Sequence, residues 1–96
     1  MIQQRIDRLF NGEEVTYSEG GNSMMPIIKH RQPVTAVRQE SYEVGDVVFC
    51  KVRSRFYTHK IVAKNEKKGY QIANNKGRVN GWTHSVYAKV IKVHIK

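Results

Sequence analysis

The chain has little of several residue types, and each scarcity narrows the class of protein. It holds one cysteine, Cys50, which excludes an intrachain disulfide and a cysteine cluster for a metal. Its two prolines and seven glycines form no low-complexity tract and no interdomain linker. No run approaches the ~18 apolar residues of a membrane span, and no basic segment followed by an apolar one marks a signal peptide. We therefore expect a single cytoplasmic domain, residues 1–96, with no membrane association.

Acidic residues are almost absent from the second half of the chain. Residues 1–50 carry five Lys and Arg against seven Asp and Glu, whereas residues 51–96 carry twelve Lys and Arg and one acid, Glu66. The net charge of +9 therefore arises in the C-terminal half. This asymmetry indicates either an anionic partner, nucleic acid or an acidic protein, or a well-solvated surface. The basic residues form no run and accompany no nucleic-acid motif, so both interpretations stay open.

The hydrophobic pattern predicts a mostly β domain with a short N-terminal helix. Ile2, Ile6, Leu9 and Phe10 share one face of a helix over residues 2–10, which Asn11-Gly12 ends. From about residue 14 to residue 96, short strands alternate with turn signals, which is typical of a compact barrel-like folded sheet. We expect strands at 14–18, 33–38, 46–52, 56–63, 70–73 and 84–95, a hairpin between 46–52 and 56–63, and a loop at 79–83.

Two segments offer a serine and a base in recognisable surroundings. The segment GGNSMMP, residues 20–26, places Ser23 in a glycine-flanked turn, and YTHKIV, residues 57–62, places His59 within a strand. A serine hydroxyl is a weak nucleophile that needs a neighbouring base, and imidazole, with an unperturbed pKa of about 6.5, suits that transfer at neutral pH. The alternative interpretations, with no catalytic role, are that Ser23 is an ordinary turn serine and that His59 is a surface histidine on a strand. His30, His84 and His94 show no metal-ligand spacing, so we expect no metal.

These motifs, in this order, resemble the signal peptidase and LexA-type serine peptidase clan. The matching pieces are GNSMMP at 21–26, GDVV at 45–48, HKIV at 59–62 and Asn74-Asn75 after the strand YQI. The resemblance covers the chain from about Gly20 to its end. It implies a mostly β fold, Ser23 as nucleophile, His59 as general base as in the endoplasmic-reticulum-type signal peptidases, and no cofactor. A free-standing domain of this kind resembles one encoded by a phage or mobile element.

The surroundings of the serine and of the base leave several roles open. Strand alternation places Tyr57, His59 and Ile61 on one face, but a register slip of one residue would present Lys60 instead, as an alternative base. The N–H of Ser23 is the first candidate donor to an oxyanion. The neighbouring candidates for the turn and the oxyanion hole are Gly21, Asn22 and Met24.

The chain departs from the clan at the acidic member of the site, because no Asp or Glu follows Glu66. Asn75 or Asn80 could orient His59 in a Ser-His-Asn arrangement, or the site is a dyad, or it is impaired. An asparagine stabilises an imidazolium less than a carboxylate does, so activity should be weaker. The sequence predicts a serine peptidase acting on a peptide or protein. The alternative is an inactive peptidase fold that binds nucleic acid or a protein partner through residues 51–96. A third option is a protein that inhibits or recruits a host factor.

Overall fold

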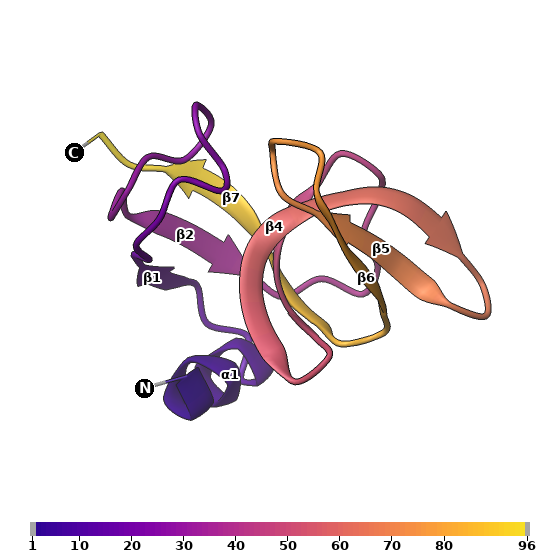
Figure 1. Cartoon of the computed structure of the whole chain (residues 1–96). Coiled ribbons are helices and arrows are strands. Elements are labelled where there is room, and N and C mark those ends of the chain that lie inside the picture. Colours follow the sequence, from indigo (N-terminus) through magenta and orange to yellow (C-terminus); the bar gives the residue numbers. More distant parts are fainter. Residues whose placement is uncertain (1, 96) are drawn as a thin grey trace.

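The structure, a computed structural model, describes residues 2–95 (Figure 1). Within these residues one helix precedes seven strands. The helix is α1 (Ile2–Phe10), and the strands are β1 (Val15–Tyr17), β2 (Val34–Val37), β3 (Val47–Val52), β4 (Arg55–Asn65), β5 (Gly69–Ala73), β6 (Val79–Thr83) and β7 (Val86–Val93).

All of these strands belong to one antiparallel sheet with the order β1-β2-β7-β3-β4-β5-β6. The last strand, β7, lies between β2 and β3, so it joins the N-terminal strands to the rest of the sheet. The sheet is folded, and Figure 1 shows β4 bending through it, but β1 and β6 remain separate edges and no barrel closes. The prediction of a mostly β domain with a short N-terminal helix is confirmed.

Helix α1 packs on the sheet through part of its expected apolar face. Leu9 is fully buried. After the helix, the N–H of Gly12 donates to the Leu9 carbonyl, and Gly12 turns the chain away with a φ of +84°. Phe10, expected on the buried face, is 56% exposed and lies against Tyr87 and the Arg38 guanidinium. Successive helical positions differ by about 100° in direction, so Leu9 and Phe10 cannot both face the core squarely.

Two hydrophobic clusters form the core, and β3 contributes to both. Phe49 is fully buried in one cluster, where its ring centroid lies within 6 Å of three other aromatic rings. The neighbouring β3 residues Val48 and Cys50 belong to the second cluster. Since β3 is buried on both faces, its sequence is a continuous apolar run rather than an alternating one. The three rings around Phe49 are those of Tyr17, Phe56 and Tyr87.

The prediction of a loop at residues 79–83 is wrong, because these residues form β6 and pair with β5. Gly81 has a φ of +139°, and an added Cβ would come within 3.3 Å of Val52. Trp82 lies on this strand, with the Lys68 ammonium 5.5 Å from its ring centroid. The glycine interrupts the alternating pattern that marks a strand, so pairing with β5 rather than local preference decides the structure here.

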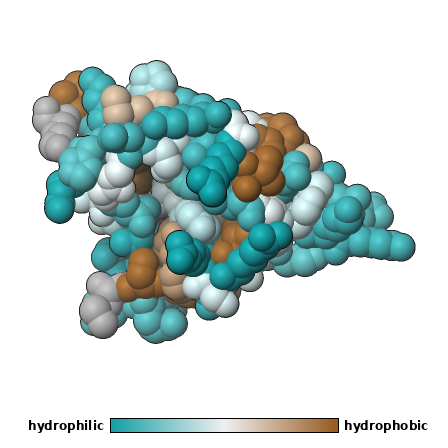
Figure 2. Space-filling model, in the orientation of Figure 1, coloured by the Kyte–Doolittle hydropathy of each residue, from teal (hydrophilic) through white to brown (hydrophobic). Residues whose placement is uncertain are grey.

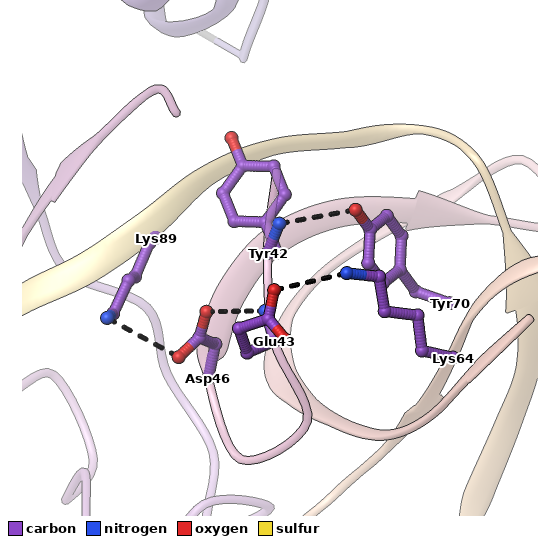
Figure 3. A network of polar contacts seen from close by, with 6 residues as sticks. All are labelled: Tyr42, Glu43, Asp46, Lys64, Tyr70 and Lys89. Atoms are coloured by element: carbon purple, nitrogen blue, oxygen red, sulfur yellow. Dashed lines mark hydrogen bonds and ion pairs between the residues drawn. The ribbon is translucent and has the colours of Figure 1, made fainter. Parts of the chain in front are cut away.

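The turn that enters β3 is held by polar contacts from β4, β5 and β7 (Figure 3). Asp46 accepts a hydrogen bond from the Glu43 N–H at 2.9 Å, and its other carboxylate oxygen lies 3.4 Å from the Lys89 ammonium of β7. Lys64 of β4 donates to the Glu43 carboxylate at 3.1 Å. These contacts place β3, and therefore its partner β4, in a defined register.

Hydrophilic residues cover most of the face in Figure 2, and the hydrophobic side chains there form separate patches. Among residues 2–95, no helix has the length and hydrophobicity needed to cross a bilayer. In the same part of the chain, the ion pairs use Arg5 and Arg8 from α1 and, from the basic half, only Lys64 and Lys89. Most cations of the C-terminal half therefore have no carboxylate beside them.

Phe49→Ala should lower the free energy of unfolding by about 3–5 kcal/mol, because it removes a ring that three others contact and leaves a cavity. Urea unfolding measures the change. Ile91→Ala on β7 is the control, since Ile91 is 46% exposed, and it should change stability by less than about 0.5 kcal/mol. Equal effects of the two substitutions would contradict the central position of Phe49.

Candidate active site

Ser23 lies in the loop between β1 and β2, residues 18–33, next to a turn that contains the cis Met25–Pro26 peptide bond. The N–H of Ile28 bonds to the Met24 carbonyl at 2.9 Å and closes that turn. In the described residues, neither the N–H of Ser23 nor that of Met24 donates a hydrogen bond. Two adjacent backbone donors are therefore available at the serine.

The structure brings His59 into hydrogen-bond contact with Ser23. The Nε2 atom of His59 lies 3.0 Å from the Ser23 Oγ. His59 stands on β4 opposite Val48 of β3, and it is 6% exposed. Its ring packs against that of Tyr57, 4.7 Å between centroids, as expected for two residues on the same face of a strand. The backbone ladder and this stacking hold the imidazole toward the serine loop.

Asn80 on β6 occupies the other side of the imidazole. Its Oδ1 atom lies 2.7 Å from the Nδ1 atom of His59. An amide oxygen can only accept, so the neutral ring carries its proton on Nδ1 and presents the lone pair of Nε2 to the serine hydroxyl. Of the two asparagines that the sequence offered for this position, Asn80 contacts the imidazole. Asn80 lies on β6, in the segment that the sequence predicts as a loop.

Burial lowers the pKa of His59 below its ordinary value of 6.5. The hydrogen bond with Asn80 and the negative charge of Glu19 act in the opposite direction and only partly offset that effect. The imidazole is therefore neutral at pH 7. A neutral ring with a free lone pair on Nε2 is the form that can accept a proton from a hydroxyl.

Asn75, the other expected orienting residue, holds the serine loop instead of the imidazole. Its backbone N–H donates to the Ser23 carbonyl at 2.8 Å, and its side-chain amide donates to the Met25 carbonyl at 2.9 Å. Lys60, the alternative base, donates to the Asn75 Oδ1 at 3.3 Å. Lys60 is thus directed to the turn after β5, while its neighbour His59 is directed to the serine hydroxyl.

Ser23 and His59 open onto a cleft of about 150 Å³. Sequence analysis missed Glu19, whose carboxylate lies in this cleft, accepts a hydrogen bond from the Thr58 hydroxyl and comes within 3.8 Å of the Arg5 guanidinium. The Thr58 hydroxyl accepts in turn from the Tyr17 hydroxyl at 2.7 Å. Glu19 continues the every-second-residue pattern of β1, and that is the signal that could have found it. Other cleft residues are Met24, Ile28, Val34 and Phe56.

The strand β4 leaves part of one edge unpaired beside the cleft. Its first half pairs with β3, whereas β5 pairs with it only from Lys60 onward. The N–H and C=O groups of Ile61 bond toward the β3 side. Alternation along the strand then directs the backbone groups of Phe56 and Thr58 away from β3. Both residues line the cleft, so their backbone groups can pair with an extended chain there.

The remaining residues expected around an oxyanion hole have different surroundings. The Gly21 N–H donates to the Nδ1 of His30 at 2.7 Å, so it already has an acceptor. The Asn22 carbonyl accepts the N–H of Met25 at 3.2 Å and helps shape the turn. The Met24 side chain is buried, and its backbone N–H donates no hydrogen bond in the described residues.

The structure also bears on metal and thiol chemistry. Within residues 2–95, no group of three His, Cys, Asp or Glu lies close enough together to hold a metal ion. Cys50 is fully buried, as expected, and burial raises the pKa of its thiol to about 12. The thiolate is the reactive form of cysteine, so Cys50 is a packing residue.

Comparison with models of protein families finds no match for this chain, and comparison with curated proteins finds none either. Because a fold hosts many functions, a function has to be inferred from the geometry of the site itself.

The pKa of His59 should depend on which residue stands at position 80. Asn80→Ala removes a hydrogen bond that favours the charged ring and should lower the pKa further, whereas Asn80→Asp places a carboxylate at Nδ1 and should raise it. NMR titration of the imidazole measures all three values. Equal pKa values in the three proteins would contradict the contact between Asn80 and His59.

The same shift sets the direction of a pH effect on stability. The folded state binds the His59 proton more weakly than the unfolded chain, whose histidine has the ordinary pKa of 6.5. The stabilisation is therefore complete above pH 6.5 and is lost as the pH falls from there to the lower folded pKa. Urea unfolding over this range should show a smaller loss in His59→Gln than in the wild type.

Asn75→Ala should loosen the serine loop without unfolding the domain. It removes the amide donor to the Met25 carbonyl and the acceptor of Lys60, at a cost of about 1 kcal/mol in global stability. Hydrogen exchange followed by mass spectrometry should show faster exchange in residues 20–30. Lys76→Ala, an exposed position in the same turn, is the control and should exchange as the wild type does. Unchanged exchange in Asn75→Ala would contradict the holding role of this residue.

Proposed function

We propose that this protein is a serine peptidase in which Ser23 attacks a peptide carbonyl and His59 takes the serine proton. The observation that carries the proposal is the hydrogen-bond chain from the Ser23 Oγ through both ring nitrogens of His59 to the Asn80 Oδ1, 3.0 and 2.7 Å long, beside an open cleft. A nucleophile, a base and an orienting acceptor in this order form the constellation that acyl transfer requires. The resemblance of the surrounding motifs to the signal peptidase and LexA-type clan supports the same reaction class.

The proposed reaction proceeds in two stages. Ser23 Oγ bonds to the carbonyl carbon while its proton passes to the Nε2 of His59, and the N–H groups of Ser23 and Met24 receive the charge on the carbonyl oxygen. His59 then donates the proton to the leaving amine as the C–N bond breaks, which leaves an acyl-serine. A water molecule, deprotonated by His59, attacks the acyl carbon. The acid leaves, and the Ser23 oxygen recovers the proton.

The substrate that the cleft favours is an extended peptide. The unpaired edge of β4 offers the backbone N–H and C=O groups of Phe56 and Thr58 to a strand that lies beside the serine loop. Added strands of this kind gain affinity from backbone hydrogen bonds, and their side chains gain specificity from pockets. An extended peptide bound there would pass Ser23 with its carbonyl groups accessible.

A neutral amide stands where a serine peptidase usually has a carboxylate behind its histidine. Asparagine at that position of a Ser-His-Asp triad lowers kcat about 10⁴-fold, because it stabilises the wrong tautomer of the histidine. Here the amide oxygen faces Nδ1, so the tautomer is the productive one and the loss should be smaller. What Asn80 cannot supply is the charge that stabilises an imidazolium. We therefore expect a working but slow enzyme.

Labelling by a fluorophosphonate probe tests this function. The wild type should be labelled at Ser23, located by peptide mass spectrometry. Ser23→Ala should not be labelled at all, and His59→Ala should react at least about 100-fold more slowly, the lower end of what general-base catalysis contributes. Ser41→Ala, an exposed serine outside the site, should behave as the wild type. Label on another serine, or a wild type that neither labels nor cleaves a library of extended peptides, would contradict the proposal.

A second candidate, binding of nucleic acid, is favoured by the charge distribution. The ion pairs in the described residues engage only Lys64 and Lys89 of the basic half, and Lys68 lies over the ring of Trp82. Uncompensated cations next to an aromatic ring are typical of a surface for single-stranded nucleic acid. Binding that weakens steeply with salt and persists in Ser23→Ala would support this function in place of the peptidase.

A further inference from the structure

Two hydrogen bonds close the neck of the loop that carries Ser23. The N–H of Arg31 donates to the Glu19 carbonyl at 2.9 Å, and the N–H of Gly21 donates to the Nδ1 of His30 at 2.7 Å. The His30 ring also lies against Gly20, where an added Cβ would come within 3.1 Å of the ring Cε1. The imidazole of His30 therefore lies beside the two glycines that precede the proposed nucleophile.

The bond at Gly21 matters because only Asn22 separates that residue from Ser23. Gly21 has a φ of +106°, and glycine can adopt many other conformations at little steric cost. Fixing one backbone conformation costs entropy, which a single hydrogen bond can largely offset. The contact with His30 thus selects one conformation for the chain that leads into Ser23.

The same bond decides which backbone donors face a substrate. With its N–H directed to His30, Gly21 does not compete for the carbonyl oxygen of a peptide. The N–H groups of Ser23 and Met24 donate to no acceptor in the described residues, so they are the candidate donors to an oxyanion. An oxyanion hole works when its donors point to one place before the reaction begins.

We propose that His30 is a positioning residue for Ser23, acting through the Gly21 N–H, an inference that rests on the proposed peptidase function. Among the described residues, His30 is not one of those that line the cleft. Its contribution is an acceptor atom at the place of Nδ1. Asparagine carries its Oδ1 the same number of bonds from Cα as the histidine Nδ1, so His30→Asn should retain the acceptor, and His30→Ala should lose it.

The test compares the inactivation kinetics of the wild type, His30→Ala and His30→Asn with the fluorophosphonate probe. His30→Ala should lower the limiting inactivation rate about tenfold and leave the half-saturating probe concentration unchanged, because misplacement of the reacting groups by less than 1 Å slows reaction without weakening binding. His30→Asn should stay within about threefold of the wild type, since it keeps one hydrogen bond of modest energy. Ile27→Ala, an exposed position in the same loop, is the control and should match the wild type.

An NMR measurement shows whether the variants changed the intended bond. The Gly21 amide proton should lie downfield in the wild type and in His30→Asn and should move upfield in His30→Ala. Loss of the downfield position with no change in inactivation rate would overturn the role of His30 and leave the peptidase function standing. A slow His30→Asn that keeps the amide signal would also overturn it. A wild type with an unreactive Ser23 would overturn both proposals together.

Discussion

Three consecutive residues of β4 hold the serine loop, and the site depends on them. The Thr58 hydroxyl donates to the Glu19 carboxylate at the start of the loop. His59 contacts the Ser23 hydroxyl, and Lys60 reaches the same loop through the turn after β5. Side chains alternate between the two faces of a strand. Three consecutive residues can therefore contact one loop only where the neighbouring strand has ended and the loop can reach both faces. That condition is met where β5 stops pairing with β4.

This arrangement has an electrostatic consequence. The imidazole lies in a low-dielectric setting and is bonded to a neutral amide, so burial dominates its protonation. Glu19, the acid whose charge acts on His59, is bonded to Thr58 and lies near Arg5, which partly neutralises that charge. A histidine kept neutral in this way is a ready proton acceptor but a poorly stabilised imidazolium. In the proposed reaction, such a site would favour the first proton transfer more than it would stabilise the charged state that follows.

Sequence reasoning predicted the helix, most of the strands and the two segments that meet at the site, because periodicity and turn residues are local signals. It was wrong at residues 79–83, where Gly81 breaks the alternation and pairing with β5 imposes a strand. That error left the position of Asn80 open, since a residue in a loop can point anywhere. Glu19 and His30 were not found because their contacts form only in the folded structure. The one local signal in the sequence is the alternation of β1, which continues to Glu19.

The open edge of β4 links fold and function in a different way. An unpaired strand edge invites association with other chains, and proteins keep such edges short or flank them with charge. Here the edge ends at Lys60, where β5 begins to pair, and starts at the exposed Arg55. The loop that carries Ser23 lies beside this short edge, so a strand added there lies next to the serine hydroxyl. Closure of the sheet into a barrel would join β1 to β6 and would leave this stretch of β4 as it is, so the open edge arises because β5 pairs with only part of β4.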